Sequence, residues 1–226
     1  MRTLSTTVFL ALFSLAACAK DPSADAPAAK VSAPEAAPVP ANSPAAADPP
    51  AVVGAQELAL TGHIGFIGSK VTGAHEGEFK DFTGKIVLVD GKPQGGKLEF
   101  SVKTASVAII DATVGKEKLE NHLKSTDFFD AEHFPEARFV SKEISQGAGG
   151  KYTVKGTLTL KGISRDLEFP STIETSGGDI RGRSEFTINR KDFGLVYAGK
   201  ADDLIRDGVV LKIDLKGKIP GTAAAL

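Results

Sequence analysis

The chain has 226 residues, and its 27 Lys and Arg against 28 Asp and Glu give a formal net charge of -1. That balance excludes the broadly basic surface that a nucleic-acid-binding protein needs. The single Cys excludes a disulfide within the chain and the cysteine-rich zinc and redox motifs. No stretch is long and apolar enough to predict a transmembrane helix.

The first 17 residues have the pattern of an export signal. Arg2 supplies a positive start, an apolar run follows, and small residues end the segment at Leu15-Ala16-Ala17-Cys18. This tetrapeptide resembles the lipobox of bacterial lipoproteins, which implies cleavage before Cys18 and lipidation of that residue. Ala19, in place of an Asp, implies sorting to the outer membrane, facing the periplasm. The alternative is an ordinary signal peptide with a chance Cys.

An Ala/Pro-rich stretch follows. Of the 33 residues from 19 to 51, 13 are Ala and 8 are Pro, so the segment lacks the bulky residues that a core requires. We expect residues 18–56 to be a disordered linker that carries the lipidated Cys, with a reach on the order of 100 Å. Residues 57–220 then form the folded domain, and residues 221–226 form a tail.

The folded part is dominated by strand patterns. Apolar and polar residues alternate with a period of two, which is typical of strands with one buried and one wet face. About eight such strands predict a closed antiparallel barrel or a sandwich, and closure is favoured because it removes exposed edges. A helical pattern over 116–124 is the one insertion. The expected strands lie near 62–71, 82–89, 98–103, 137–144, 152–160, 166–171, 180–188 and 209–216.

Several motifs resemble the YceI family over about residues 58–219. They are Gly77-Glu78-Phe79 with Phe82-Thr83-Gly84, the run from Glu120 to Asp130, the run from Gly156 to Arg165, and the run from Ile188 to Gly194. The resemblance implies an extended eight-stranded, lipocalin-like antiparallel β-barrel with a long apolar tunnel for polyisoprenoid or fatty-amide chains. Family members often open with a Trp, a residue this chain lacks. Leu58 or Leu60 is expected to fill that place, and His63 stands where a Ser is common.

A tunnel needs bulky apolar walls and some empty space. The expected inward positions Gly156, Ser171, Gly182 and Ser184 are small and leave room, although a solid Phe-rich core is the alternative. Two polar residues are candidates for a ligand head group: His122, otherwise a residue at the edge of the core, and Arg190, otherwise the ion-pair partner of Asp192. The expected apolar lining is Phe66, Phe79, Phe100, Val102, Phe128, Phe129, Leu158, Phe169, Phe186 and Ile188.

Residues for chemistry are few. The four His residues lack metal-ligand spacing, so no metal site is predicted. Neither a catalytic motif nor a nucleotide-binding glycine loop occurs, so no enzyme activity and no cofactor are predicted beyond a bound long-chain isoprenoid or other lipid.

The leading hypothesis is a lipoprotein that binds or carries an amphiphilic lipid: a polyisoprenoid, an isoprenoid quinone or a fatty amide. The alternatives are a lipid-modifying enzyme using His122 or Arg190, and a structural envelope protein with a filled barrel. The expected partners are the lipid and, through acylated Cys18, the membrane; a homodimer stays open.

Overall fold

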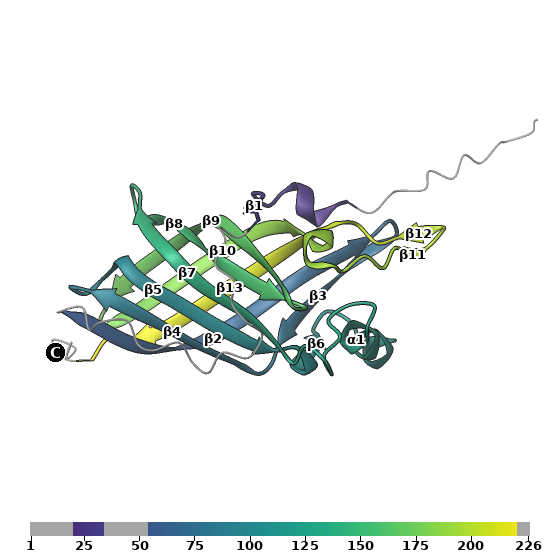
Figure 1. Cartoon of the computed structure of the whole chain (residues 1–226), viewed down its shortest axis with the longest axis horizontal. Coiled ribbons are helices and arrows are strands. Elements are labelled where there is room, and N and C mark those ends of the chain that lie inside the picture. The colour runs from purple at the N-terminus through teal and green to yellow at the C-terminus, as the bar shows by residue number, and fades with distance from the viewer. Residues whose placement is uncertain (1–19, 34–53, 221–226) are drawn as a thin grey trace, which may run out of the picture.

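Eight long strands close into an antiparallel barrel (Figure 1). The computed structural model describes residues 20–33 and 54–220, and the predicted signal peptide, Cys18 and the tail lie outside these ranges. The strands run in the order β13–β10–β9–β8–β7–β5–β4–β2, and β2 pairs with β13 to complete the ring. Their bounds are β2 (Ala55–Lys70), β4 (Phe82–Val89), β5 (Lys92–Lys103), β7 (Glu136–Gln146), β8 (Lys151–Leu160), β9 (Ile163–Ser176), β10 (Asp179–Asn189) and β13 (Gly208–Lys218).

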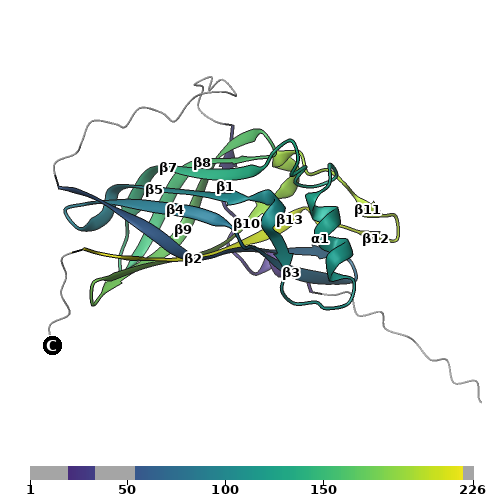
Figure 2. The ribbon, with the colours of Figure 1, turned by 90° about the horizontal axis from the view of Figure 1, so that it is seen from below.

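Smaller elements gather at one end of the barrel. The strand β3 pairs with the second half of β2, and β6 pairs with β3. The helix α1 and the hairpin of β11 and β12 lie at this same end in both views (Figures 1 and 2). The bounds are β3 (Gly73–Phe79), η2 (Thr104–Ser106), β6 (Val107–Ile109), α1 (Lys116–Lys124), η3 (Arg190–Phe193), β11 (Gly199–Lys200) and β12 (Asp203–Leu204).

The alternation in the sequence produces this barrel. In β8 every second residue, from Tyr152 to Leu160, is buried, and the residues between them are partly exposed. Leu58, at 2% exposure, is buried in β2 at one of the two positions expected to replace the missing Trp. Tight turns join the strands: Lys161 and Gly162, between β8 and β9, both have positive φ, which the favoured two-residue hairpin turn requires.

One wall of the barrel has a seam. β9 and β10 pair only from Thr172↔Arg183 to Ser176↔Asp179, so the first half of β9 lacks β10 as a neighbour. A segment from the N-terminal part of the chain, residues 20–33, lies in this gap. We call it the N-terminal strap; it contains η1 (Pro22–Ala24) and β1 (Lys30–Ser32).

The strap makes backbone hydrogen bonds to both sides of the seam. On one side β1 pairs with β9, with Val31 opposite Leu167. On the other side the N–H of Ala29 donates to the carbonyl of Thr187, and the N–H of Thr187 donates to the carbonyl of Pro27, both at 2.9 Å. The expected disordered linker is therefore wrong for residues 20–33, because backbone pairing does not require bulky side chains. Residues 34–53 lie outside the described part of the chain.

Two ion pairs fasten the strap. Asp21 lies 3.2 Å from Arg206, and Lys30 pairs with Glu168. Burial opposes ionisation of Asp21, but hydrogen bonds from Ser23 and the charge of Arg206 hold the pKa of its carboxyl below the ordinary value. The strap is thus held both by its backbone and by charge.

Candidate ligand cavity

The barrel encloses a cavity of about 220 Å³ at the end that carries α1. Its wall is built from the inward side chains of the long strands, with contributions from β3, β6 and α1. Every residue of the expected lining contributes, and so does Arg190; His122 does not. The lining residues predicted from the sequence are Phe66, Phe79, Phe100, Val102, Phe128, Phe129, Leu158, Phe169, Phe186, Ile188 and Arg190. That these residues bind a ligand stays a prediction.

His122 lies outside this wall. Its Nε2 is 3.0 Å from a carboxylate oxygen of Asp127, and its ring packs edge-on against Phe128 and Tyr197, each at 5.0 Å between centroids. Phe128 lines the cavity, so His122 supports a wall residue from behind. His122 is not among the residues that line the cavity, and its contact with a head group stays a prediction.

Arg190 opens η3 and is only 3% exposed. Its guanidinium donates to the carbonyl oxygens of Arg206 at 3.0 Å, of Ile205 at 3.3 Å and of Leu195. The expected ion pair with Asp192 is wrong: the carboxylate beside Arg190 is that of Asp207, at 3.4 Å. Burial lowers the pKa of the Arg190 guanidinium, and Asp207 opposes that shift. Arg190 therefore ties a long loop to the cavity wall.

Ser69 is a lining residue that the sequence did not reveal. It is 6% exposed, and its hydroxyl has no hydrogen-bond partner among the described residues. The inward-facing positions of β2 include Ile64, Phe66 and Gly68. Alternation therefore predicts that the side chain of Ser69 faces outward. A buried, unsatisfied hydroxyl is costly, and a polar ligand atom would satisfy it.

The basic side chains that line the cavity are paired with acids. Lys70 pairs with Asp203, and His75 lies 3.4 Å from Asp111. Arg190 and Arg206 have Asp207 and Asp21 as their partners. The charges of the arginines and the lysine at this end of the cavity are thus balanced by neighbouring carboxylates.

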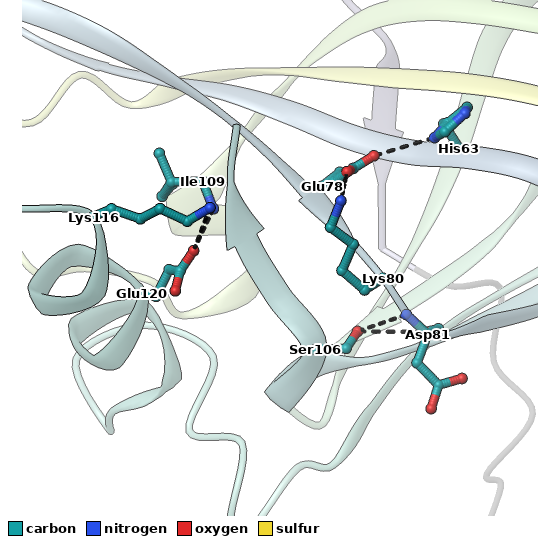
Figure 3. Close-up of polar contacts among 8 residues, drawn as sticks. All are labelled: His63, Glu78, Lys80, Asp81, Ser106, Ile109, Lys116 and Glu120. Atoms are coloured by element: carbon teal, nitrogen blue, oxygen red, sulfur yellow. Dashed lines mark hydrogen bonds and ion pairs between the residues drawn. The ribbon is translucent and has the colours of Figure 1, made fainter. Parts of the chain in front are cut away.

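The helix α1 is fastened against the cavity by one carboxylate (Figure 3). Glu120 accepts the N–H of Ile109 in β6 at 2.8 Å and lies 3.7 Å from Lys116 in its own helix. From this position α1 contributes Leu119 and Leu123 to the lining.

A neighbouring network in the same view links β2 and β3. Glu78 lies 3.2 Å from His63 and also pairs with Lys80, whose hydrogen bond holds the pKa of the Glu78 carboxyl below its ordinary value. His63, at the position where the family commonly has Ser, is therefore a surface partner of Glu78. It is not among the lining residues.

Replacing Glu120 with Ala should loosen α1. The substitution leaves the buried Ile109 N–H without its acceptor, which costs about 1–3 kcal/mol of unfolding free energy. Glu120→Gln retains an acceptor oxygen and should lose less than half of that. Urea unfolding gives the free energies, and hydrogen exchange at Ile109 reports the local bond. Equal losses in the two variants would show that this hydrogen bond does not hold the helix.

A second, smaller space of about 40 Å³ lies deeper in the barrel. It shares Phe169 and Ile213 with the main cavity. The resemblance implied a single long tunnel, but aromatic rings divide the described interior into two spaces. Three of the four small residues expected to leave room, Ser171, Gly182 and Ser184, line the smaller one.

The fourth small residue has a different role. A Cβ atom at Gly156 would lie 2.5 Å from the Phe139 ring, so the absence of a side chain there makes room for that ring. Gly156 therefore serves packing and not an open cavity.

A closed antiparallel barrel around an apolar cavity defines a lipocalin-like binding barrel. The chain matches the YceI-like domain over residues 59–217 and belongs to that family. A UPF0312 protein of Pseudomonas putida (strain W619) is 34% identical over 129 residues, 54% of this chain and 65% of that protein. A UPF0312 protein of Pseudomonas fluorescens (strain Pf-5) is 38% identical over 143 residues, 58% of this chain and 67% of that protein.

Among solved structures, BcnA of Burkholderia cenocepacia matches with a TM-score of 0.59 at 25% identity, covering 68% of this chain and 94% of BcnA. The predictions of the family and of the eight-stranded barrel are thereby confirmed. The barrel is the fold of a binding protein.

Within residues 20–33 and 54–220, no three His, Cys, Asp or Glu side chains cluster as a metal site would need. No helix in these ranges is long and apolar enough to cross a bilayer.

Proposed function

We propose that this protein is a cell-envelope lipoprotein that binds or carries a neutral amphiphile with a long apolar tail. The observation that carries the proposal is the cavity itself: apolar walls surround it, and polar groups gather only at the end near Ser69 and Arg190. In this arrangement the head group lies at the polar end, and the tail points into the barrel. A polyisoprenoid alcohol, an isoprenoid quinone and a fatty amide all have this chemistry.

The energetics favour such a ligand. Each buried methylene contributes about 0.8 kcal/mol, so a tail binds tightly without any charged partner. A neutral oxygen in the head group would satisfy the buried hydroxyl of Ser69. The cations at the polar end are paired with carboxylates, so there is no net positive charge there to attract an anionic head group.

The proposal includes the membrane anchor. The lipobox at Leu15-Ala16-Ala17-Cys18 supports acylation of Cys18, and Ala19 supports an outer-membrane location facing the periplasm. Two acyl signals on one residue would give stable attachment. The barrel would then receive or deliver its lipid beside the bilayer.

Lipid extraction tests the binding function. A Cys18→Ser form has no acylation site and can be purified without detergent, so any extracted lipid is one bound in the barrel. We expect mass spectrometry to find a neutral, long-tailed lipid at near-stoichiometric amounts. The stripped protein should take up an added fatty amide. A product chemically changed from the added amide would support an enzyme instead.

A matched pair of variants links uptake to the cavity. Leu211→Trp fills the main cavity from β13, whereas Lys216→Trp places the same side chain at an exposed position of that strand. We expect uptake to fall at least tenfold in the first and to be unchanged in the second. An empty extract combined with no uptake by the stripped protein would favour a structural protein with a filled barrel.

A further inference from the structure

A row of aromatic rings crosses the barrel between its two internal spaces. The row consists of Phe100 in β5, Phe139 in β7, Phe169 in β9 and Phe186 in β10. Successive ring centroids are 5.2, 5.4 and 4.2 Å apart, and the last pair is stacked with an interplanar angle of 12°. These separations are typical of attractive aromatic contacts, so the rings form one packed layer.

The layer is buried and lies at the boundary between the two spaces. Phe139, Phe169 and Phe186 are each at most 2% exposed. Along β9, Leu167 lies on the main-cavity side of Phe169, and Ser171 lies on the other side. Phe169 itself lines both spaces, so its ring is the partition at this strand.

The space beyond the partition is open because its residues are small. Ser171, Gly182 and Ser184 contribute to its wall. A Cβ atom added at Gly182 would meet no atom within 4 Å. Packing therefore does not require a glycine at position 182, and the space is apolar enough to take the end of a hydrocarbon chain.

We propose that the stacked rings of Phe169 and Phe186 set the length of the apolar tail that the barrel accepts. This inference rests on the proposed function and adds to it a rule for which tail lengths the barrel binds, which we call the selection rule. An apolar cavity of about 150 Å³ holds one benzene ring, so a cavity of about 220 Å³ holds a tail segment of roughly ten carbons. The tail then ends against the aromatic row, and a ligand with a longer tail can no longer place its head group at the polar end beside Ser69.

Removal of either ring would join the two spaces. The tail could then continue past the row into the region lined by Ser171, Gly182 and Ser184. Each further methylene that enters should tighten binding about fourfold, so three more would give on the order of 50-fold.

A chain-length series tests the rule. Primary fatty amides of roughly 8 to 22 carbons keep one neutral head group while the buried apolar length changes. For the unaltered barrel in the Cys18→Ser form, we expect affinity to rise with length and then to level off where the tail reaches the row. Phe186→Ala and Phe169→Ala should move that plateau to longer amides. Phe186→Leu, which keeps more of the packing, should move it in the same direction by less.

Gly182→Val is the matched control. It fills the second space and leaves all four rings of the row in place, so it should leave the plateau of the unaltered barrel where it is. Combined with Phe186→Ala, it should cancel the gain for long amides.

Two results overturn the inference in different ways. If affinity continues to rise through the whole series without a plateau, or if Gly182→Val alone shortens the preferred amide, the tail already passes the row and the rings do not select length. If no amide binds any variant while every variant keeps its cooperative urea transition, the proposed binding function fails and the selection rule fails with it.

Discussion

Replacing Arg190 with Leu is expected to lower the free energy of unfolding by about 3–5 kcal/mol, because the guanidinium is a buried tie between loop carbonyls. It donates to the carbonyl oxygens of Leu195, Ile205 and Arg206 and lies beside Asp207. A leucine leaves these acceptors without donors in a site that water reaches poorly. Urea unfolding followed by far-ultraviolet circular dichroism measures the loss.

Two further variants serve as controls for Arg190→Leu. Arg190→Lys retains the positive charge, but its single ammonium cannot reach all the carbonyl oxygens that the planar guanidinium contacts. About half of the loss of unfolding free energy seen in Arg190→Leu should therefore remain. Lys191→Leu removes the adjacent cation, which is half-exposed and lies 2.9 Å from Asp207, and should cost less than about 1 kcal/mol. A loss in Arg190→Leu no greater than in Lys191→Leu would mean that the buried ties do not stabilise the loop.

The barrel was predictable because strand alternation is a local signal. The period of two in segments such as Tyr152–Leu160 needs only neighbouring residues to be read, and burial of one face follows from it. The same reasoning brought the apolar residues from Phe66 to Ile188 to one interior, and the structure does place them around one cavity. Whether they bind lipid remains the prediction tested above.

The features that were missed depend on contacts distant in sequence. Asp207, and not the nearby Asp192, pairs with Arg190 because η3 turns the chain back toward the loop before β13. Ser69 is buried out of phase at the end of β2, beyond the last residue that pairs with β13, where its carbonyl accepts the N–H of Arg206 from the loop before β13. Alternation predicts which face a side chain occupies, but it does not predict which rings will stack across a lumen.

The strap changes how the proposed anchor relates to the barrel. An Ala/Pro-rich composition predicted a long flexible spacer, yet the described chain begins at Lys20, only two residues after Cys18. Two residues reach about 7 Å at most, so an acylated Cys18 would hold the seam between β9 and β10 close to the bilayer. The strap is therefore both a wall segment and, in the proposed lipoprotein, the connection to the membrane.

Deletion of residues 20–33 is expected to lower the free energy of unfolding by about 2–4 kcal/mol, because it removes backbone hydrogen bonds on both sides of the seam and the packing of Val31. The deletion is made in the Cys18→Ser form, so that anchoring does not contribute. Hydrogen exchange gives a local readout: the Thr187 N–H, which donates to Pro27, should be protected in the full chain and should exchange rapidly without the strap.

A point variant separates packing of the strap from its length. Val31→Asp places a charge where Val31 packs against the core beside Leu167, and it should reproduce most of the loss; Ser32→Asp, at an exposed position, should not. If the Thr187 N–H stays protected after the deletion, the seam closes without the strap by direct pairing of β9 and β10. Residues 20–33 would then be only a tether. Rapid exchange would instead mean that the barrel wall depends on the N-terminal strap, the segment nearest the proposed lipid anchor. Displacing the strap near the membrane would then open the wall beside three residues that line the cavity: Leu167, Phe169 and Ile188.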